Sequence, residues 1–240
     1  MIKIENAEVI GWEHAIRGMR NPMNSWEKSD TGWVADIDHD GDSYLEFDFE
    51  WESYKVIGPN DHQLMMNLAH GGPVHAKYRR MIAVYLDITA PLYWWKEFDT
   101  YKVGTVANSC STMHKIHAKE FELEDFSHEH LRTDKSDFLD GATKPFSALN
   151  MLEDTVCVLN VYRERYLETH DKEYWWQMIQ LLPTSYNQKR TVMLNYEVLA
   201  AMYESRKNHK LDEWREFCKW IERLPYSELI IGEKEDTGDA

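Results

Sequence analysis

The chain has 240 residues, of which 43% are hydrophobic and 13% aromatic, so it can bury a substantial core in one large domain or two small ones. Its 27 Lys and Arg residues are outnumbered by 42 Asp and Glu residues, which gives a net charge of −15. A surface this acidic repels duplex nucleic acid and anionic membranes and excludes both as main partners, although a small anionic ligand can still bind in a locally basic pocket.

Cysteine content and hydropathy indicate a reduced, cytoplasmic protein. Cys110, Cys157 and Cys218 are odd in number and far apart, so no disulfide framework is expected. We find no signal peptide, and no apolar run approaches the length of a membrane span.

The N-terminal residues predict a strand and a short helix. Residues 2–10 alternate in polarity, as a first or edge strand does, and residues 13–19 have a helical pattern. Arg17 and Arg20 lie close together at the end of this helix. Paired arginines at a helix end can hold phosphate or carboxylate, but their spacing favours a solvated face with local ion pairs.

Residues 30–55 include the most acidic stretch and are expected to form a surface insertion. From Asp36 the pattern Asp-x-Asp-x-Asp-Gly imitates the start of a calcium loop. Its twelfth position is Phe47, which cannot ligate calcium, so we expect no structural calcium here and assign no metal site to the chain. Residues 44–51 then alternate aromatic and polar side chains, which predicts a hairpin strand.

The middle of the chain predicts a strand and two helices. A helix is expected at residues 59–69, with Pro59-Asn60-Asp61 as its cap, and a basic turn follows at residues 75–80. Residues 81–88 are apolar and β-branched, which predicts a buried strand. The next helix begins at Pro91 and ends near Tyr101.

Residues 108–112, Asn-Ser-Cys-Ser-Thr, are expected to form a short loop rich in side-chain donors and acceptors. A strand, a helix and such a loop make a good frame for a phosphorylated ligand. The alternative is a buried strand–helix unit whose Ser and Asn side chains only cap turns, and the local pattern by itself favours this alternative.

The second half of the chain is predicted to be mainly helical. Residues 117–140 are charged with scattered aromatic side chains, which indicates a mobile or loosely helical excursion. The histidine pairs in and before it lack an acidic or cysteine partner at a metal-binding interval. Further along, we expect helices at residues 145–166, 174–182, 198–205 and 212–224, a strand at residues 190–196, and a disordered acidic tail at residues 233–240. These elements predict a single α+β domain over residues 1–232.

Two separated blocks of the sequence resemble the flavin-dependent thymidylate synthase (ThyX) family. The first, ITAPLYWWKEFDTYKVGTVANSCST, is similar to the strand, Ala-Pro and helix that lead into the family signature RHR…S.NE.S.RY. The second, LLPTSYNQKRTVMLNYEVLAAMYESRKNHKLDEW, is similar to the family's Leu-Pro segment, Asn-containing strand, Arg-ended helix and final helix. The resemblance implies an α/β fold with a mixed sheet and long helices, and a homotetramer with sites built between subunits.

The resemblance also implies a chemistry. The family transfers a one-carbon unit to C5 of a pyrimidine deoxynucleotide, converting dUMP to dTMP, with FAD as its flavin and with NADPH and methylenetetrahydrofolate as co-substrates. A relative that acts on a different pyrimidine nucleotide is also compatible with the resemblance, as viral base-modification pathways require.

In the first block, the resemblance assigns roles on both sides of the site. Lys102 falls at the last basic residue of RHR and Thr105 at the first Ser of the signature, so both are assigned to the cofactor. Thr100 and Tyr101 replace the other two basic residues. The positions that resemble N-E-x-S are assigned to the substrate: Asn108, Ser109 and Ser111.

Outside the first block, further roles follow from the resemblance. Asn195 matches an Asn on the flavin side, His209 lies next to the position of a flavin-stacking His, and His75 matches the first His of the family's H-x-x-P-F-x-H turn, so all three are assigned to the cofactor. Arg206 falls on the Arg that pairs with the uracil ring and is assigned to substrate binding and catalysis. Glu197 stands where the family has an Arg.

The altered positions leave two hypotheses. The first is an active methyltransferase in which other basic side chains rebuild the anion pocket, and Arg79 and Arg80 are assigned to the substrate on this ground. The full set of candidates is Arg79, Arg80, Lys102, Lys189, Arg190 and Arg206. The second hypothesis is a non-catalytic relative that keeps the fold as a nucleotide-binding or oligomeric interaction protein. The retained Asn195 and Arg206 narrowly favour the enzyme, for which we expect Arg206→Ala to weaken dUMP binding without lowering the melting temperature.

Overall fold

The computed structural model describes residues 2–35, 53–134 and 146–232. These residues confirm the predicted α+β fold. The calcium-like pattern from Asp36, the strand predicted at residues 44–51 and the tail at residues 233–240 lie outside them.

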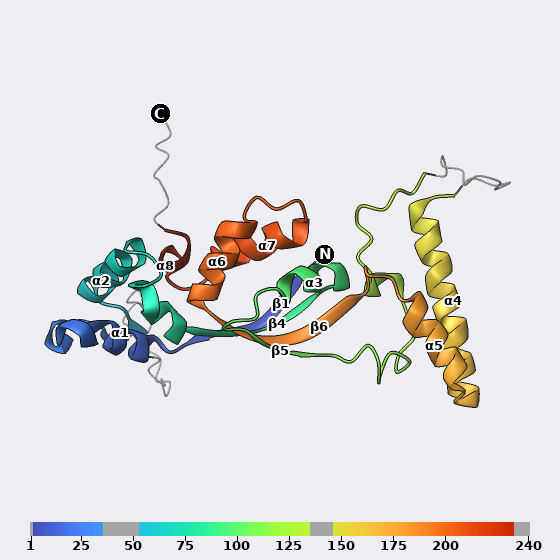
Figure 1. Ribbon diagram of the computed structural model, residues 1–240, viewed down its shortest axis with the longest axis horizontal. Helices are drawn as coiled ribbons and strands as arrows, with labels where there is room; N and C mark the ends of the chain where they lie inside the picture. The colour runs from blue at the N-terminus through green and yellow to red at the C-terminus, as the bar shows by residue number, and fades with distance from the viewer. Residues whose placement is uncertain (1, 36–52, 135–145, 233–240) are drawn as a thin grey trace, which may run out of the picture.

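The centre of the fold is a four-stranded antiparallel sheet with the strand order β1-β4-β6-β5 (Figure 1). Its strands are β1 (Lys3–Ile10), β4 (Ala83–Pro91), β5 (Val106–Ser109) and β6 (Asn187–Asn195). β4 and β6 pair along their whole length, from Ala83 opposite Asn195 to Pro91 opposite Asn187. Alternate side chains of β4, from Val84 to Ala90, are buried because successive residues of a strand point to opposite faces.

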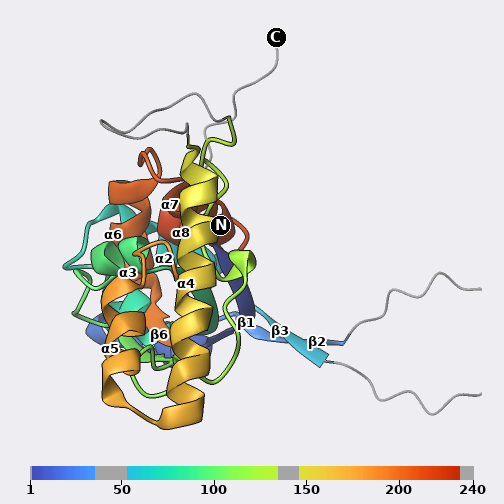
Figure 2. The ribbon, with the colours of Figure 1, turned by 90° about the vertical axis from the view of Figure 1, so that its right-hand side faces the viewer.

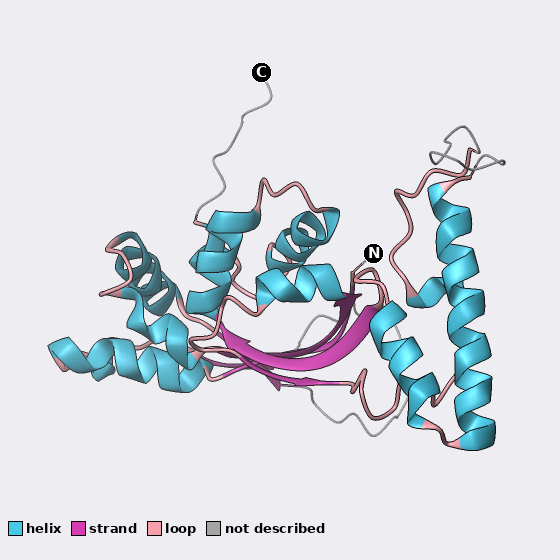
Figure 3. Cartoon of the chain, turned by 45° about the vertical axis from the view of Figure 1, so that its right-hand side comes forward, coloured by secondary structure: helices cyan, strands magenta, loops and turns pink. Residues whose placement is uncertain are grey.

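Helices cover one face of this sheet (Figure 3). They are α3 (Leu92–Phe98), α6 (Tyr196–Arg206) and α7 (Asp212–Ile221). The core between them is aromatic, with the fully buried side chains Trp94, Trp95, Phe98, Trp214 and Phe217. The rings of Trp94 and Trp214 lie 4.8 Å apart, so this core ties α3 to α7.

A second group of helices packs at one end of the sheet. It comprises α1 (Trp12–Arg20), α2 (Pro59–His70), α8 (Glu228–Ile231) and the short 3-10 helices η1 (Asn21–Met23), η2 (Trp26–Lys28) and η3 (Ala76–Met81). The hairpin of β2 (Gly32–Ala35) and β3 (Ser53–Val56) projects beside them (Figure 2). The predicted helices at residues 13–19 and 59–69 are confirmed, whereas α8 was not predicted because four residues are too few for a periodic signal.

At the opposite end, α4 (Ala148–Thr169) and α5 (Lys172–Leu181) form an antiparallel pair with its own hydrophobic cluster (Figure 1). Ser147 caps α4 by accepting a hydrogen bond from the backbone N–H of Asn150. Both helices confirm the predictions for residues 145–166 and 174–182 within a few residues. None of the helices in the described part of the chain combines the length and apolar character needed to cross a membrane.

The prediction of a mobile or loosely helical excursion is wrong for residues 117–134. Phe121 and Phe126 are 4% and 1% exposed, and both belong to the cluster that packs against α4 and α5. Asn160 on α4 holds the backbone of Phe121 from both sides, since its side chain accepts from the N–H at 2.8 Å and donates to the carbonyl at 2.9 Å. The segment has little regular structure beyond η4 (Leu123–Asp125), so its apolar residues follow no helical or strand period.

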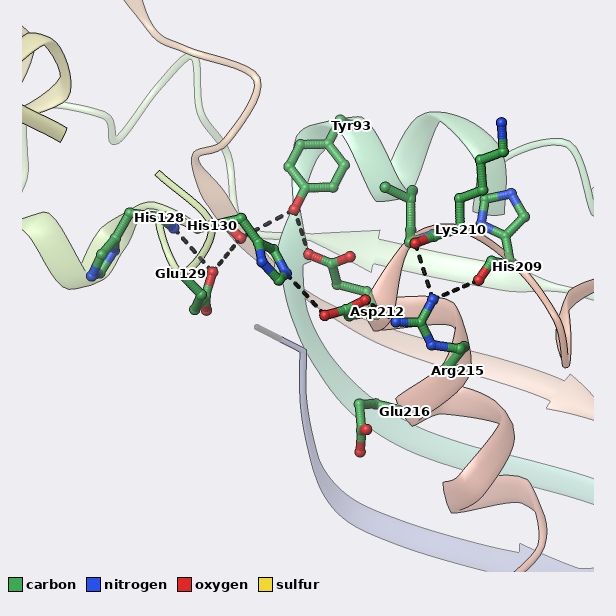
Figure 4. A network of polar contacts seen from close by, with 12 residues as sticks. Tyr93, His128, Glu129, His130, His209, Lys210, Asp212, Arg215 and Glu216 are labelled. Atoms are coloured by element: carbon green, nitrogen blue, oxygen red, sulfur yellow. Dashed lines mark hydrogen bonds and ion pairs between the residues drawn. The ribbon is translucent and has the colours of Figure 1, made fainter. Parts of the chain in front are cut away.

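Polar contacts connect this segment to the helices over the sheet (Figure 4). The hydroxyl of Tyr93 on α3 lies 3.1 Å from that of Ser127 and also donates to Glu213 on α7. The Nε2 atom of His130 lies 2.9 Å from the carboxylate of Asp212, at the start of α7. The two hydrophobic clusters are therefore joined by a polar seam rather than by a shared apolar core.

Candidate functional site

A cavity of about 480 Å³ opens where the end of α3 meets the edge strand β5 and its neighbour β6, a place called the β5–β6 edge below. Its lining includes Lys102, Thr105 and Arg190, which the sequence nominated, and Asp99 and Tyr101, which it did not. The cavity volume falls within the range of about 300–1,000 Å³ that is usual for small-molecule sites.

A tight turn after α3 brings Lys102 and Thr105 to this cavity. Thr105 donates its hydroxyl to the carbonyl of Tyr101, and Gly104 adopts a φ of +81°, which favours glycine. A Cβ on Gly104 would also lie 3.0 Å from the side chains of Asn195 and Val198. The turn is therefore pressed against the start of α6.

Arg190 is held in place from three directions. Its NH1 atom lies 2.7 Å from the carboxylate of Asp99, its Nε donates to Gln188 at 3.0 Å, and its guanidinium stacks 4.1 Å from the ring centre of Trp95. Lys102, by contrast, has no ion pair among the described residues, and it is exposed. In a chain of net charge −15, this cavity therefore contains one unpaired cation next to a fixed guanidinium.

The predicted polar loop at residues 108–112 is in part a strand. Asn108 and Ser109 belong to β5 and lie opposite Thr191 and Arg190 of β6, with both side chains exposed. Ser111 follows the strand, and its hydroxyl accepts from the backbone N–H groups of the turn that begins there. The local sequence looked like a loop because it is short and polar, and the strand exists because β6 supplies its hydrogen-bond partners.

Arg206 and His209 both contact the carboxylate of Glu97, which lies behind the cavity. Arg206 donates to Glu97 at 2.7 Å and to the hydroxyl of Tyr101 at 3.0 Å, and its guanidinium lies 4.8 Å from the ring centre of Trp214. The same Glu97 oxygen lies 3.3 Å from His209 and accepts from the indole of Trp214 at 2.9 Å. Tyr101 contributes to the cavity wall, so Arg206 lies one side chain behind it.

This network changes what we expect of Arg206. Its side chain is 19% exposed and pairs with Glu97 where α3, α6 and α7 meet, so we expect Arg206→Ala to lower the melting temperature as well as to weaken ligand binding. Glu97 gave no sign of this role in the sequence, because a single acidic residue on a short helix matches no motif.

A third group of nominated residues lies at the start of α6. Asn195 caps this helix, since its side-chain oxygen accepts from the N–H of Val198 at 3.0 Å. Arg80, on η3, approaches Glu197 to 3.8 Å. The Nε of Arg79 and the second carboxylate oxygen of Glu197 are buried without a hydrogen-bond partner in the described part of the chain. The acidic residue that replaces a family Arg here thus lies near Arg80 and does not pair with the Nε of Arg79.

A buried phenol and an exposed imidazole complete this region. Tyr78, on η3, is buried and donates to the carbonyl of Met65 at 2.9 Å, and burial raises the pKa of its phenol to about 12. His75 lies directly before η3 and is exposed. The phenol of Tyr78 thus remains neutral at physiological pH and cannot serve as a base there.

Lys189 does not join the cavity. Its side chain lies 3.1 Å from Asp87 on the neighbouring strand, on the face of the sheet opposite the buried side chains. Hydrogen bonds from Thr191, Asn6 and Lys189 lower the pKa of Asp87 to about 2, so this carboxylate is charged at neutral pH. Successive side chains of a strand point to opposite faces of the sheet, so Lys189 and its neighbour Arg190 lie on opposite faces of β6.

The structure thus sorts the nominated residues into three groups. Lys102, Thr105 and Arg190 line the cavity, with Asn108 and Ser109 on the strand beside it. Arg206 and His209 form the layer behind it. Asn195 with Arg79 and Arg80 occupy the start of α6 and the adjoining η3, and His75 precedes η3.

Comparisons with known proteins bear on the fold. No protein-family model and no curated protein matches the chain. Solved structures do: thymidylate synthase X (ThyX) from Helicobacter pylori with FAD and dUMP has a TM-score of 0.61 at 16% identity, covering 95% of this chain and 96% of that one. The UMP/dUMP methylase PolB from Streptomyces cacaoi bound with 5-Br UMP has a TM-score of 0.55 at 12% identity, covering 92% of this chain and 88% of that one. The chain therefore has the fold of flavin-dependent thymidylate synthase ThyX, along nearly its whole length.

Proposed function

We propose that this chain binds a pyrimidine nucleotide and, with FAD, transfers a one-carbon unit to C5 of its base. The observation that supports this best is the cavity at the β5–β6 edge, where Lys102 and the Asp99-paired Arg190 present cationic groups in an otherwise acidic protein. The fold matches solved structures that contain FAD and dUMP or a brominated UMP, which favours a nucleotide over other anions.

The donor set of the cavity fits the phosphate groups of such ligands. Lys102 supplies a free ammonium group and Thr105 lies beside it, while Asp99 and Trp95 keep the Arg190 guanidinium oriented before a ligand arrives. When bound, FAD would supply the hydride or one-carbon chemistry that amino acid side chains cannot perform. On this proposal NADPH and methylenetetrahydrofolate are the co-substrates, and the protein orients the ligands and stabilises negative charge.

Arg206 would act at the base of the nucleotide. Its Nε and NH1 already donate to Tyr101 and Glu97, so its remaining guanidinium nitrogen is the one that we assign to a uracil carbonyl. Glu97 would then orient the guanidinium group of Arg206, as Asp99 orients that of Arg190. A hydrogen bond from a charged donor of this kind contributes about 1.5–3 kcal/mol.

The alternative is a non-catalytic, nucleotide-binding or oligomeric interaction protein with the same fold. The pairing of Arg206 with Glu97 and the approach of Arg80 to Glu197 favour it, since both contacts occupy cations that a ligand would otherwise use. Flavin binding separates the two hypotheses. A purified protein that is yellow, or that becomes yellow when FAD is added, agrees with the enzyme, and a colourless protein that FAD cannot reconstitute contradicts it.

Nucleotide binding is best tested by calorimetry with dUMP. The resemblance assigned Lys102 to the cofactor, but Lys102 is the unpaired cation of the cavity that we propose for the nucleotide, so we expect Lys102→Ala to weaken dUMP binding about tenfold. Lys96→Ala is the matched control: Lys96 is exposed on α3 but does not line the cavity, so dUMP affinity should be unchanged. If the native chain binds no pyrimidine nucleotide at millimolar concentration, the proposed function is wrong.

A further inference from the structure

A second cavity, of about 320 Å³, lies at the end of the α4–α5 pair. Its lining includes His114 and His117 from the loop after β5, Tyr166 and His170 from the end of α4, and Lys172 and Trp175 from α5. Figure 1 shows that loop running from β5 toward the helix pair. None of these residues lines the cavity at the β5–β6 edge, so the two sites are separate.

The walls of this second cavity are fixed by contacts within the protein. The indole N–H of Trp175 donates to the carbonyl of Met113 at 2.9 Å, which ties α5 to the loop. The ring of His117 packs edge-on against Tyr166 at 4.8 Å, and Tyr166 in turn lies 6.1 Å from His170. Arg163 donates to the backbone carbonyl of His117 at 3.0 Å. The cavity is thus formed before any ligand binds.

The chemistry of the lining is that of an anion site. Three imidazoles and one ammonium group line the cavity, and no carboxylate does so among the described residues. Lys172 is also the first residue of α5, whose N-cap Asp171 already accepts from the backbone N–H groups of Glu173 and Tyr174. In a chain of net charge −15, a lining that has an ammonium group and, among the described residues, no carboxylate favours an anion.

His117 can present only one of its ring nitrogens to this cavity. Its Nδ1 is buried from solvent and has no hydrogen bond in the described part of the chain, which leaves Nε2 as the nitrogen for a ligand oxygen. An imidazole nitrogen donates to such an oxygen when it carries the proton. A metal ion is not the expected ligand, because no set of three ligating side chains among the described residues is close enough to hold one.

We propose that this cavity binds a phosphate or phosphomonoester anion, with Lys172 as the countercharge and His114, His117 and His170 as N–H donors. The inference does not depend on the function proposed above, since it uses none of the same residues. Tyr166 and Trp175 provide apolar walls against which the organic part of a phosphomonoester can pack.

Calorimetry of the full-length chain with inorganic phosphate and with phenyl phosphate, at low salt, tests this proposal. Both titrations are repeated in a Lys102→Ala background, which weakens the other cavity and leaves this one intact. We expect saturable binding that persists in this background. Tighter binding of phenyl phosphate would assign the site to phosphomonoesters, and equal affinity would assign it to the phosphate group alone.

Two variants test the assigned residues. Lys172→Ala should weaken phosphate binding about tenfold. The matched control is Lys115→Ala, which removes the same charge from the loop that carries His114 and His117 but lies outside the lining. This control should leave the phosphate affinity within about twofold. His117→Phe keeps a ring against Tyr166 and removes both ring nitrogens, so phosphate affinity should fall while the melting temperature does not. Absence of saturable binding at millimolar phosphate, or unchanged affinity in Lys172→Ala and His117→Phe, would overturn the proposal.

Discussion

At the scale of single residues, Asp61 is a fully buried carboxylate that pairs with a buried arginine. Its side chain is fully buried and lies 2.6 Å from the Nε of Arg20, which is 4% exposed. It also accepts from the hydroxyls of Ser29 and Thr31, at 2.7 and 2.6 Å. The sequence suggested a solvated Arg17–Arg20 face and a capping role for Asp61, whereas the structure pairs Arg20 with Asp61 inside the protein.

We therefore expect Asp61→Asn to destabilise the protein by about 3–5 kcal/mol, because it leaves the charge of Arg20 buried without its partner. The pair of Asp99 and Arg190 provides a control: Asp99→Asn should cost at most about 1 kcal/mol, since Asp99 is 53% exposed and Arg190, at 14%, keeps its contacts with Gln188 and Trp95. Urea denaturation measures both values. A cost for Asp61→Asn no greater than that for Asp99→Asn would contradict this account of the buried pair.

The same carboxylate predicts a pH dependence. Burial by itself raises the pKa of Asp61, but hydrogen bonds from Thr31, Ser29 and Arg20 outweigh it and place the pKa below its ordinary value. A depressed pKa in the folded state means that this contribution to stability is complete above about pH 4 and is lost as the pH falls through the folded pKa. The free energy of unfolding should thus fall less steeply below pH 4 in Asp61→Asn than in the native chain.

At the scale of elements, α2 begins with a cap supplied from outside its own sequence. The carboxylate of Asp30 accepts from the backbone N–H of Asn60 at 2.9 Å and from that of Asp61 at 3.1 Å. Gly58 makes room for it, since a Cβ there would lie 2.2 Å from an Asp30 oxygen. The surface insertion predicted from residue 30 therefore starts with a residue that stabilises the fold.

Gly58→Ala should destabilise the protein by about 1–2 kcal/mol, because the added methyl group displaces the cap of α2. Gly32→Ala is the matched control, since no atom lies within 4 Å of a Cβ built at Gly32. Thermal unfolding followed by circular dichroism compares them. Equal melting temperatures for the two variants would show that Asp30 does not determine the stability of α2.

At the scale of the whole molecule, two hydrophobic clusters are joined by the polar seam of Figure 4. The sequence predicts one domain over residues 1–232, and on that prediction both clusters unfold together in one calorimetric transition. Tyr93→Phe removes the hydroxyl that contacts both Ser127 and Glu213, so it should weaken this coupling. Two resolved transitions in the native chain would instead identify the α4–α5 pair as a separate folding unit.

Assembly is the second property of the whole molecule, and we expect a homotetramer. One side of α4 exposes apolar side chains seven and three residues apart: Met151, Val158 and Val161 are 47%, 41% and 53% exposed. Apolar side chains grouped in this way are usually covered in an oligomer. Light scattering should give four times the chain mass of 28.5 kDa at micromolar concentration, and a clean monomer mass would contradict the prediction.

The sequence by itself determined the elements whose signals are local. Local pattern located α4, α6 and β4: Leu152 and Leu159 of α4 are buried seven residues apart, the buried residues of α6 recur every three residues, and alternate residues of β4 are buried. The two sequence blocks also led to the fold that the comparisons support. Lys102 and Thr105 could be assigned to the site from the sequence because they match a short signature and lie three residues apart.

Tertiary structure decided the rest, since the partners concerned are distant in sequence. Glu97 and Arg206 are 109 residues apart, and Arg20 and Asp61 are 41 apart, so no local pattern reports either ion pair. β5 is a strand because β6 offers it hydrogen bonds, and its own residues are polar and exposed. The second cavity, which is lined by His114, His117 and His170, arises for the same physical reason: its side chains come from three segments that only packing brings together.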